Sequence, residues 1–372
     1  MKIPADDCNG GRASLSSTPL DEIARFDPTV PIERAWMPPS SWYTSADIAS
    51  LEADRVFARH WLPIARSEEL AEVGSAISGC VAGEPWLLVR DRDNIVRAFH
   101  NTCRHKGNVL VAESGSRGEE LVCGYHGWAY ALDGRLLRAP RVAGIEDFDR
   151  DAMSLVPLAL ASWGPWLFIC SDPAKSWPTG LGPLTEALDS TDWDQLRYVR
   201  SASWELKCNW KVYVDNYLDG GYHIGTIHPS LAEQLDETGY QTTLGDGFSL
   251  QRAPASDSGG ERIGGGAHYA FVYPNFMVNR YGDCLEGNIV VPLGPDRCRV
   301  DYDFFFAEGT AEQAIESSVA ESVVIQDQDV AVSEAVQRGL SSRGFDRGRY
   351  APRVEQAEHH FHCTLARDLR NP

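Results

Sequence analysis

Residues 61–172 alternate between short apolar runs and turns rich in Gly, Asp and Asn. The runs contain many β-branched and aromatic residues, which is typical of short strands, at 84–91, 94–101, 127–137 and 164–171. Residues 89–99 (VRDRDNIVRAF) predict one β-hairpin, and residues 130–137 (YALDGRLL) predict a second with Asp-Gly at its tip. We therefore expect a small all-β domain over residues 56–172.

The segment before this region has a different spacing. Residues 41–60 open with Ser and Thr, which favour helix starts, and then place four apolar side chains at helical intervals. Residues 1–55 are therefore expected to form an N-terminal arm and a helix.

Residues 171–184 are rich in Pro and Gly and predict a domain boundary. Beyond it, strand-like runs precede a long helical pattern over residues 310–340. Residues 173–372 are thus expected to form an antiparallel sheet covered by helices, which makes the chain α+β.

Composition excludes several classes of function. The 372 residues carry a formal charge of −19, whereas nucleic-acid binding requires clustered Lys and Arg. The basic stretch at residues 343–353 is interpreted as a solvated loop.

The chain has no apolar run of the roughly 20 residues that a membrane span needs, and its N-terminus lacks the apolar region of a secretory signal. We expect a cytoplasmic protein with no nucleic-acid or membrane partner.

The chain has nine cysteines. Their odd number and scatter argue against a disulfide framework. Apart from Cys103 and Cys123, they are expected to be buried small apolar residues.

Two short segments each combine one cysteine with one histidine, namely Cys103 with His105 and Cys123 with His126. Two Cys and two His are also possible zinc ligands, but the usual zinc-finger arrangement groups Cys with Cys and His with His. A Rieske [2Fe–2S] cluster uses two thiolates on one iron and two imidazoles on the other. The distribution of the four residues favours this cluster over zinc.

A second candidate metal site lies in the C-terminal half. His223 and His228 form a His-x4-His pair, which is weak evidence when taken alone. Together with a carboxylate from further along the chain, they would supply the 2-His-1-carboxylate set of non-haem iron(II) oxygenases, which leaves coordination positions open.

Both segments resemble one known family. The Cys-x-His and Cys-x2-His segments, followed by Gly127-Trp128, are similar to the Rieske motif of ring-hydroxylating oxygenase α subunits, with Gly124 where proline is common. Residues 215–223 (DNYLDGGYH) resemble the catalytic motif of that family, above all its choline monooxygenase-like branch. The resemblance extends over nearly the whole chain.

The resemblance implies a Rieske domain followed by a helix-grip, START-like catalytic domain. It implies one [2Fe–2S] cluster, held by the four residues named above, and one mononuclear Fe(II). The iron would be held by His223, His228 and Asp329, with Asp327 as the fallback carboxylate. Asn216 is expected beside the iron, and Tyr222 is expected to pack around the site.

Family members commonly have an acid three residues before the first histidine, where this chain has Gly220. We expect Asp219 to take that role through a bulge in the helix at Gly220-Gly221. It would accept a hydrogen bond from His223 or from a histidine of the cluster. Asp215 is the alternative. His359, His360 and His362 are expected to pack in a terminal helix.

The resemblance also implies a function. The chain would be a terminal oxygenase that uses O2 and NAD(P)H-derived electrons from a separate flavin/iron-sulfur reductase, and it would form a homotrimer. The branch favours a small quaternary or methylated amine as substrate, bound by aromatic side chains drawn from Tyr213, Tyr217, Phe271, Tyr273, Phe276 and Tyr281. Hydroxylation of an aromatic ring is the alternative, and a non-oxygenase electron-transfer or zinc-binding protein is a more remote one.

Overall fold

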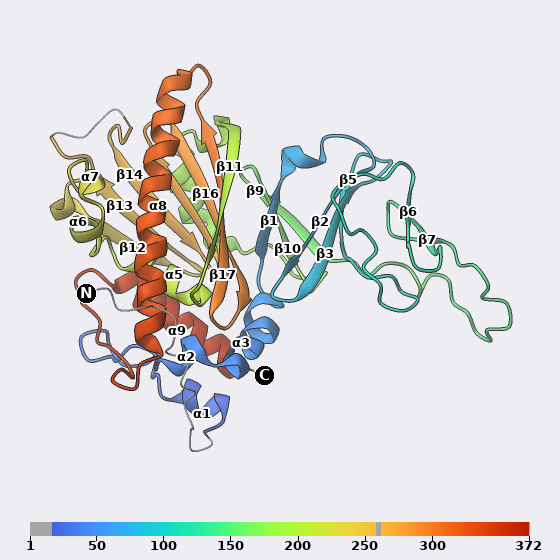
Figure 1. Ribbon diagram of the computed structural model, residues 1–372. Coiled ribbons are helices and arrows are strands. Elements are labelled where there is room, and N and C mark those ends of the chain that lie inside the picture. The colour runs from blue at the N-terminus through green and yellow to red at the C-terminus, as the bar shows by residue number, and fades with distance from the viewer. Residues whose placement is uncertain (1–16, 258–261, 372) are drawn as a thin grey trace, which may run out of the picture.

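The computed structural model describes residues 17–257 and 262–371. A large sheet crossed by one long helix forms one half of the molecule, and smaller sheets extend from it to one side (Figure 1). The chain is therefore α+β, as expected. Residues 1–16, which include Cys8 and the first part of the expected N-terminal arm, lie outside the described residues.

The large sheet has seven antiparallel strands in the order β11-β17-β16-β15-β14-β13-β12. The helix α8 (Glu312–Leu340) lies across one face together with α5 (Trp210–Leu218) (Figure 1), which confirms the predicted long helix and the helix-grip arrangement. The strands are Arg197–Leu206 (β11), Gln241–Gly245 (β12), Phe248–Pro254 (β13), Gly266–Val272 (β14), Phe276–Tyr281 (β15), Cys284–Gly294 (β16) and Arg297–Phe306 (β17).

A three-stranded sheet of β1 (Leu62–Arg66), β10 (Trp166–Cys170) and β9 (Ala159–Trp163) joins the two halves. The ring of Trp166 lies 4.9 Å from that of Phe276 and 5.2 Å from that of Phe305. One apolar core therefore continues from this sheet into the large sheet.

The remainder of the β region has a separate core. It contains a four-stranded sheet, β4-β3-β2-β5, and a three-stranded sheet, β6-β7-β8. Both predicted hairpins are confirmed, as the pairs β3/β4 and β7/β8. The strands are Ser75–Val81 (β2), Glu84–Arg90 (β3), Val96–His100 (β4), Gly115–Ser116 (β5), Glu120–Val122 (β6), Ala129–Ala131 (β7) and Leu136–Arg138 (β8).

The helical segment expected at residues 41–60 is interrupted. Ser45 has an extended backbone, with φ −90° and ψ 125°, and its hydroxyl accepts a hydrogen bond from the Ile48 amide. A new helix therefore begins there, and the segment becomes α2 (Ser41–Thr44), α3 (Ala46–Glu52) and a π-helical turn (Ala53–Phe57). The other described α-helices are Pro19–Ala24 (α1), Gly182–Asp189 (α4), Ile224–Ile227 (α6), Pro229–Ala232 (α7) and Gln356–Arg370 (α9).

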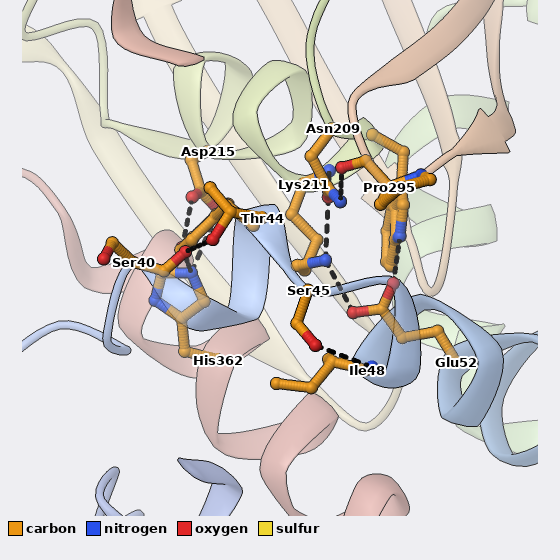
Figure 2. Close-up of polar contacts among 12 residues, drawn as sticks. Ser40, Thr44, Ser45, Ile48, Glu52, Asn209, Lys211, Asp215, Pro295 and His362 are labelled. Carbon is orange, nitrogen blue, oxygen red and sulfur yellow. Dashed lines mark hydrogen bonds and ion pairs between the residues drawn. The ribbon is translucent and has the colours of Figure 1, made fainter. Parts of the chain in front are cut away.

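A buried ion pair fixes α5 to the N-terminal helices. Lys211 Nζ lies 2.6 Å from Glu52 Oε1 and donates to Asn209 Oδ1 at 2.7 Å (Figure 2). Trp210 Nε1 donates to the other Glu52 oxygen at 2.8 Å. Lys211 and Glu52 are 0% and 1% exposed. Removing either charge would leave the other buried without an opposite charge, so this network fixes the position of α5.

The expectation that the other cysteines are buried holds for Cys170, Cys208, Cys284 and Cys298, whereas Cys363 is half-buried. It is wrong for Cys80, which is exposed at the end of β2. No helix within the described residues is long and apolar enough to span a membrane.

Candidate metal centres and substrate cavity

The two cysteine-histidine loops have the same backbone design. The carbonyl of Cys103 accepts a hydrogen bond from the Gly107 amide at 3.0 Å, and that of Cys123 accepts one from the Gly127 amide at 3.0 Å. Gly107 and Gly127 adopt φ values of 72° and 71°, a left-handed conformation that favours glycine. Each loop therefore turns back tightly and directs its Cys and His side chains to the same side.

The four side chains meet between the loops. The rings of His105 and His126 lie 4.5 Å apart, and Trp128 stacks on His105 at 4.9 Å. Cys103 and Cys123 are buried free thiols, and Tyr130 Oη lies 3.3 Å from Cys103 Sγ.

The two thiols have opposite pKa shifts, and one histidine nitrogen of this site has no partner. Burial raises the pKa of Cys103. Burial acts in the same direction on Cys123, but hydrogen bonds led by the Tyr125 amide outweigh it and lower the pKa of Cys123. His105 Nδ1 is buried without a hydrogen-bond partner. Two thiols beside two imidazoles, one with an unpartnered nitrogen, fit the mixed ligation of a Rieske cluster.

The second candidate site brings together residues from distant parts of the chain. His223, His228 and Asp329 place their ligand atoms within 4.8 Å of one another. Asp329 Oδ1 lies 3.1 Å from His228 Nε2 and 3.8 Å from His223 Nε2. Burial opposes protonation of His228, but the hydrogen bond and charge of Asp329 outweigh it and raise the pKa of His228.

Each of these side chains has a partner outside the triad. Asp219 Oδ2 lies 2.6 Å from His223 Nδ1, and Gln328 Oε1 lies 2.7 Å from His228 Nδ1. With Nδ1 occupied in this way, both histidines direct Nε2 toward Asp329. Asn216 Nδ2 donates to Asp329 Oδ1 at 2.7 Å. Two imidazole nitrogens and a carboxylate converging at one edge of a cavity fit the donor set of a non-haem iron site.

The local backbone explains the spacing between Asn216 and His223. Instead of the expected bulge, α5 ends at Leu218, and Gly220 and Gly221 follow with φ values of 74° and 77°. Two consecutive left-handed residues cannot continue a right-handed helix. The chain therefore turns back, and the Asp219 carboxylate accepts from the amides of residues 221, 222 and 223.

The structure places several other predicted residues away from the site. Asp327 accepts from Trp204 Nε1 at an exposed position, so it is not beside the histidines. Tyr222 is 64% exposed rather than packed, because the glycine turn directs it outward.

Asp215, the alternative to Asp219, lies 3.0 Å from His362 Nε2 (Figure 2) and so is paired with α9 and not with His223. Tyr43 also bonds to Asp215, and Glu358 lies close to both Asp215 and His362. His362 is fully buried in α9, as expected for a packed terminal helix.

A cavity opens beside the triad. The space open to the centre of a water-sized sphere is about 90 Å³. Phe271, Tyr273 and Phe276 do not line it, since Phe271 and Tyr273 pack on Phe361 and Phe276 packs on Trp166. The tyrosines in its wall are Tyr213, Tyr217, Tyr240, Tyr269, Tyr281 and Tyr302.

Sequence reasoning missed three polar residues of this region. Gln328 directly precedes Asp329, and that adjacency was the available signal. Glu286 and Arg262 line the cavity. Glu286 lies on a strand whose neighbouring residues are mostly apolar, which could have marked it as a candidate. Arg262 carries no comparable signal in the sequence.

The comparisons with known proteins agree with this geometry. Residues 60–149 match the Rieske [2Fe-2S] domain family, and residues 193–371 match the ring hydroxylating alpha subunit (catalytic domain) family. Choline monooxygenase of Arabidopsis thaliana is 39% identical over 94% of this chain and 86% of its own length. The oxygenase subunit of carnitine monooxygenase from Escherichia coli is 31% identical over 91% of this chain and 95% of its own.

A solved structure is similar over the same extent. The quaternary ammonium Rieske monooxygenase CntA with L-carnitine superposes with a TM-score of 0.79 and 28% identity, covering 96% of this chain and 100% of that one. A Rieske cluster and a mononuclear iron are the cofactors of such a chain. The chain therefore belongs to the Rieske non-haem iron family of ring-hydroxylating oxygenases.

Proposed function

We propose that this chain oxidises a small quaternary or methylated amine. The observation that carries the proposal is the tyrosine-lined cavity beside His223, His228 and Asp329. Tyrosine faces attract quaternary ammonium groups through their quadrupoles and contact the methyl groups. Related chains act on choline and carnitine, which supports the same class of substrate.

The ligand assignment is part of the proposal. Cys103, His105, Cys123 and His126 would hold the cluster, and His223, His228 and Asp329 would hold the iron. The cluster supplies single electrons, and the iron supplies O2 activation. For an amino alcohol the balance is one R–CH2OH, one O2, two electrons and two protons, giving R–CH(OH)2 and water.

The residues of the chain have defined tasks in this reaction. Asp219 and Gln328 hold the two histidines by their Nδ1 atoms, and Asn216 orients Asp329. The tyrosines hold the cation and exclude bulk water. Such outer contacts keep the ligand atoms aligned.

The electron supply and the assembly also belong to the proposal. We infer that a flavin/iron-sulfur reductase delivers NAD(P)H-derived electrons and that the protein acts in the cytoplasm as a homotrimer. A related quaternary ammonium Rieske monooxygenase has been described with inter-subunit electron transfer. Mixing a Cys123→Ser protein with a His228→Ala protein should restore part of the activity if electrons pass between subunits. No recovery in mixed oligomers contradicts such transfer.

Substrate-dependent O2 uptake with NADH and a reductase tests the function. We expect uptake with at least one of choline, glycine betaine and L-carnitine, accompanied by an oxidised product. Uptake and hydroxylation only with aromatic compounds such as benzoate or naphthalene would instead establish the aromatic alternative.

A further inference from the structure

The substrate cavity carries a buried carboxylate well away from the proposed iron ligands. Glu286 lies on β16, its side chain is 3% exposed, and it lines the same cavity as Asp329. Ser322 donates a hydrogen bond to Glu286. Because Ser322 and Asp329 are seven residues apart on α8, they are separated by about 10 Å along the helix axis. A small molecule whose reacting carbon lies near Asp329 can therefore direct its other end toward Glu286 within the same cavity.

Glu286 belongs to a polar row that crosses the large sheet. In the strand register it pairs with Asn279, which pairs with Tyr269, which pairs with Gln251. Directly paired residues share one face of a sheet, and three members of this row line the substrate cavity. A sheet face covered by helices is normally apolar. Polar side chains at these positions indicate a surface that binds a ligand.

The hydrogen bonds around Glu286 define its charge state. Asn279 Nδ2 donates to Oε2 at 3.0 Å, and the hydroxyls of Tyr281 and Ser322 approach Oε1. Both hydroxyls accept a hydrogen bond from Arg262 at 2.7 Å, so each directs its own proton to Glu286. The carboxylate thus acts only as an acceptor, as an ionised group does.

Arg262 does not neutralise this site completely. Its guanidinium lies 3.8 Å from Glu286 and also 3.8 Å from Glu321. Among the described residues that line the cavity, Arg262 is the one Lys or Arg. The guanidinium is thus divided between Glu286 in the cavity wall and Glu321, whose side chain is 26% exposed and lies outside the cavity lining, so Arg262 neutralises the buried Glu286 only in part. Such a wall attracts a cation and disfavours a carboxylate.

We propose that Glu286 determines specificity by selecting a cationic substrate that lacks a carboxylate. An amino alcohol with a quaternary nitrogen would be preferred over zwitterionic betaines. Arg262 acts as a positioning residue that holds Glu286 through Tyr281 and Ser322, and it does not bind a substrate carboxylate. The inference rests on the proposed function, because it requires that the cavity binds quaternary amines.

The test compares kcat/KM for choline, glycine betaine and L-carnitine in the complete enzyme with its reductase. The wild type should prefer choline. Glu286→Gln keeps the size of the side chain and an acceptor oxygen, and should lower the choline-to-betaine ratio of kcat/KM about tenfold or more, mainly through the KM for choline. Glu316→Gln, the same substitution at an exposed position on α8, should leave the ratio unaltered.

Two further measurements separate charge from a folding defect. Ser322→Ala removes one donor but no charge, and should shift the ratio in the same direction by a smaller factor. The uncharged choline isostere 3,3-dimethylbutan-1-ol should inhibit Glu286→Gln more strongly, relative to choline binding, than it inhibits the wild type. Thermal unfolding of each variant reports whether the fold is intact.

The outcomes are distinguishable. An unchanged ratio in Glu286→Gln, while the wild type still oxidises choline, overturns this inference and leaves the proposed function intact. A wild-type preference for betaines that disappears in Arg262→Met also overturns it, since Arg262 would then bind the carboxylate. A wild type that oxidises none of the three amines overturns the proposed function and this inference with it.

Discussion

The two candidate metal centres are built in different ways. The cluster loops fold on themselves, with a left-handed glycine and a short backbone hydrogen bond closing each cysteine turn. The candidate iron site takes its carboxylate from α8, 101 residues after His228, and α5 is held in position by a buried ion pair with Glu52. One centre is thus specified locally, whereas the other depends on the packing of the whole catalytic half.

Substitutions at the two centres should therefore differ in how far their structural effects spread. A substitution in a cysteine-histidine loop should affect only its surroundings, because both loops pack on an apolar core of their own. A change in the elements that support the iron site should spread, because several distant segments meet there.

The largest expected effect comes from removing one proposed ligand at each centre. His228→Ala should abolish substrate oxidation and remove the mononuclear iron while the cluster remains. Cys123→Ser should also abolish oxidation but remove the cluster. Iron analysis and low-temperature electron paramagnetic resonance of each variant check this, and loss of both metals in His228→Ala would contradict the independence of the two centres.

The buried ion pair should give the next largest effect, on stability. Lys211→Met leaves Glu52 buried without its partner and should cost about 3–5 kcal/mol of the free energy of unfolding. The exposed pair Arg138–Glu120 near the cluster loops is the matched control, and Arg138→Met should cost no more than about 1 kcal/mol. Urea denaturation measures both, and equal losses would remove the contrast between the two regions.

Asp219 should matter for activity through its contact with His223, in addition to the hydrogen bonds that it accepts from the turn. Asp219→Asn retains the size of the side chain but removes the charge that holds His223 Nδ1, so kcat/KM should fall about 10–100-fold. Asp327→Asn, on the exposed side of α8, is the control. A folded Asp219→Asn variant with wild-type kcat/KM would show that this contact does not align the histidine.

The smallest expected difference is in the stability lost when a glycine of each region is replaced by alanine. Gly107 has open space around it, so Gly107→Ala should cost only the left-handed strain of about 1–2 kcal/mol. A Cβ at Gly220 would collide with the Val354 carbonyl oxygen, so Gly220→Ala should cost about 1–3 kcal/mol more. Thermal unfolding measures the difference, and equal costs would mean that the turn after α5 is not tightly packed.

The sequence predicted elements that have strong local signals. The two hairpins, the long helix α8 and the cysteine-histidine loops follow from turn residues, helical spacing and ligand pattern. The helical spacing from Ile48 to Phe57 is confirmed, and the expected Ser/Thr start is Ser45, although a separate short helix, α2, precedes it. The outward position of Tyr222 was missed, since the direction of a side chain after two glycines depends on how the chain packs.

The sequence by itself determined the family, the two sets of candidate ligands and the α+β architecture, because short motifs and apolar periodicity are local properties. Only the tertiary structure decided that Gln328 holds His228 and that Glu286 and Arg262 face the same cavity as Asp329. These residues lie on separate helices, strands and loops, and their contacts depend on strand register and on the packing of α8 across the sheet. Neither property can be read from any one segment of the chain.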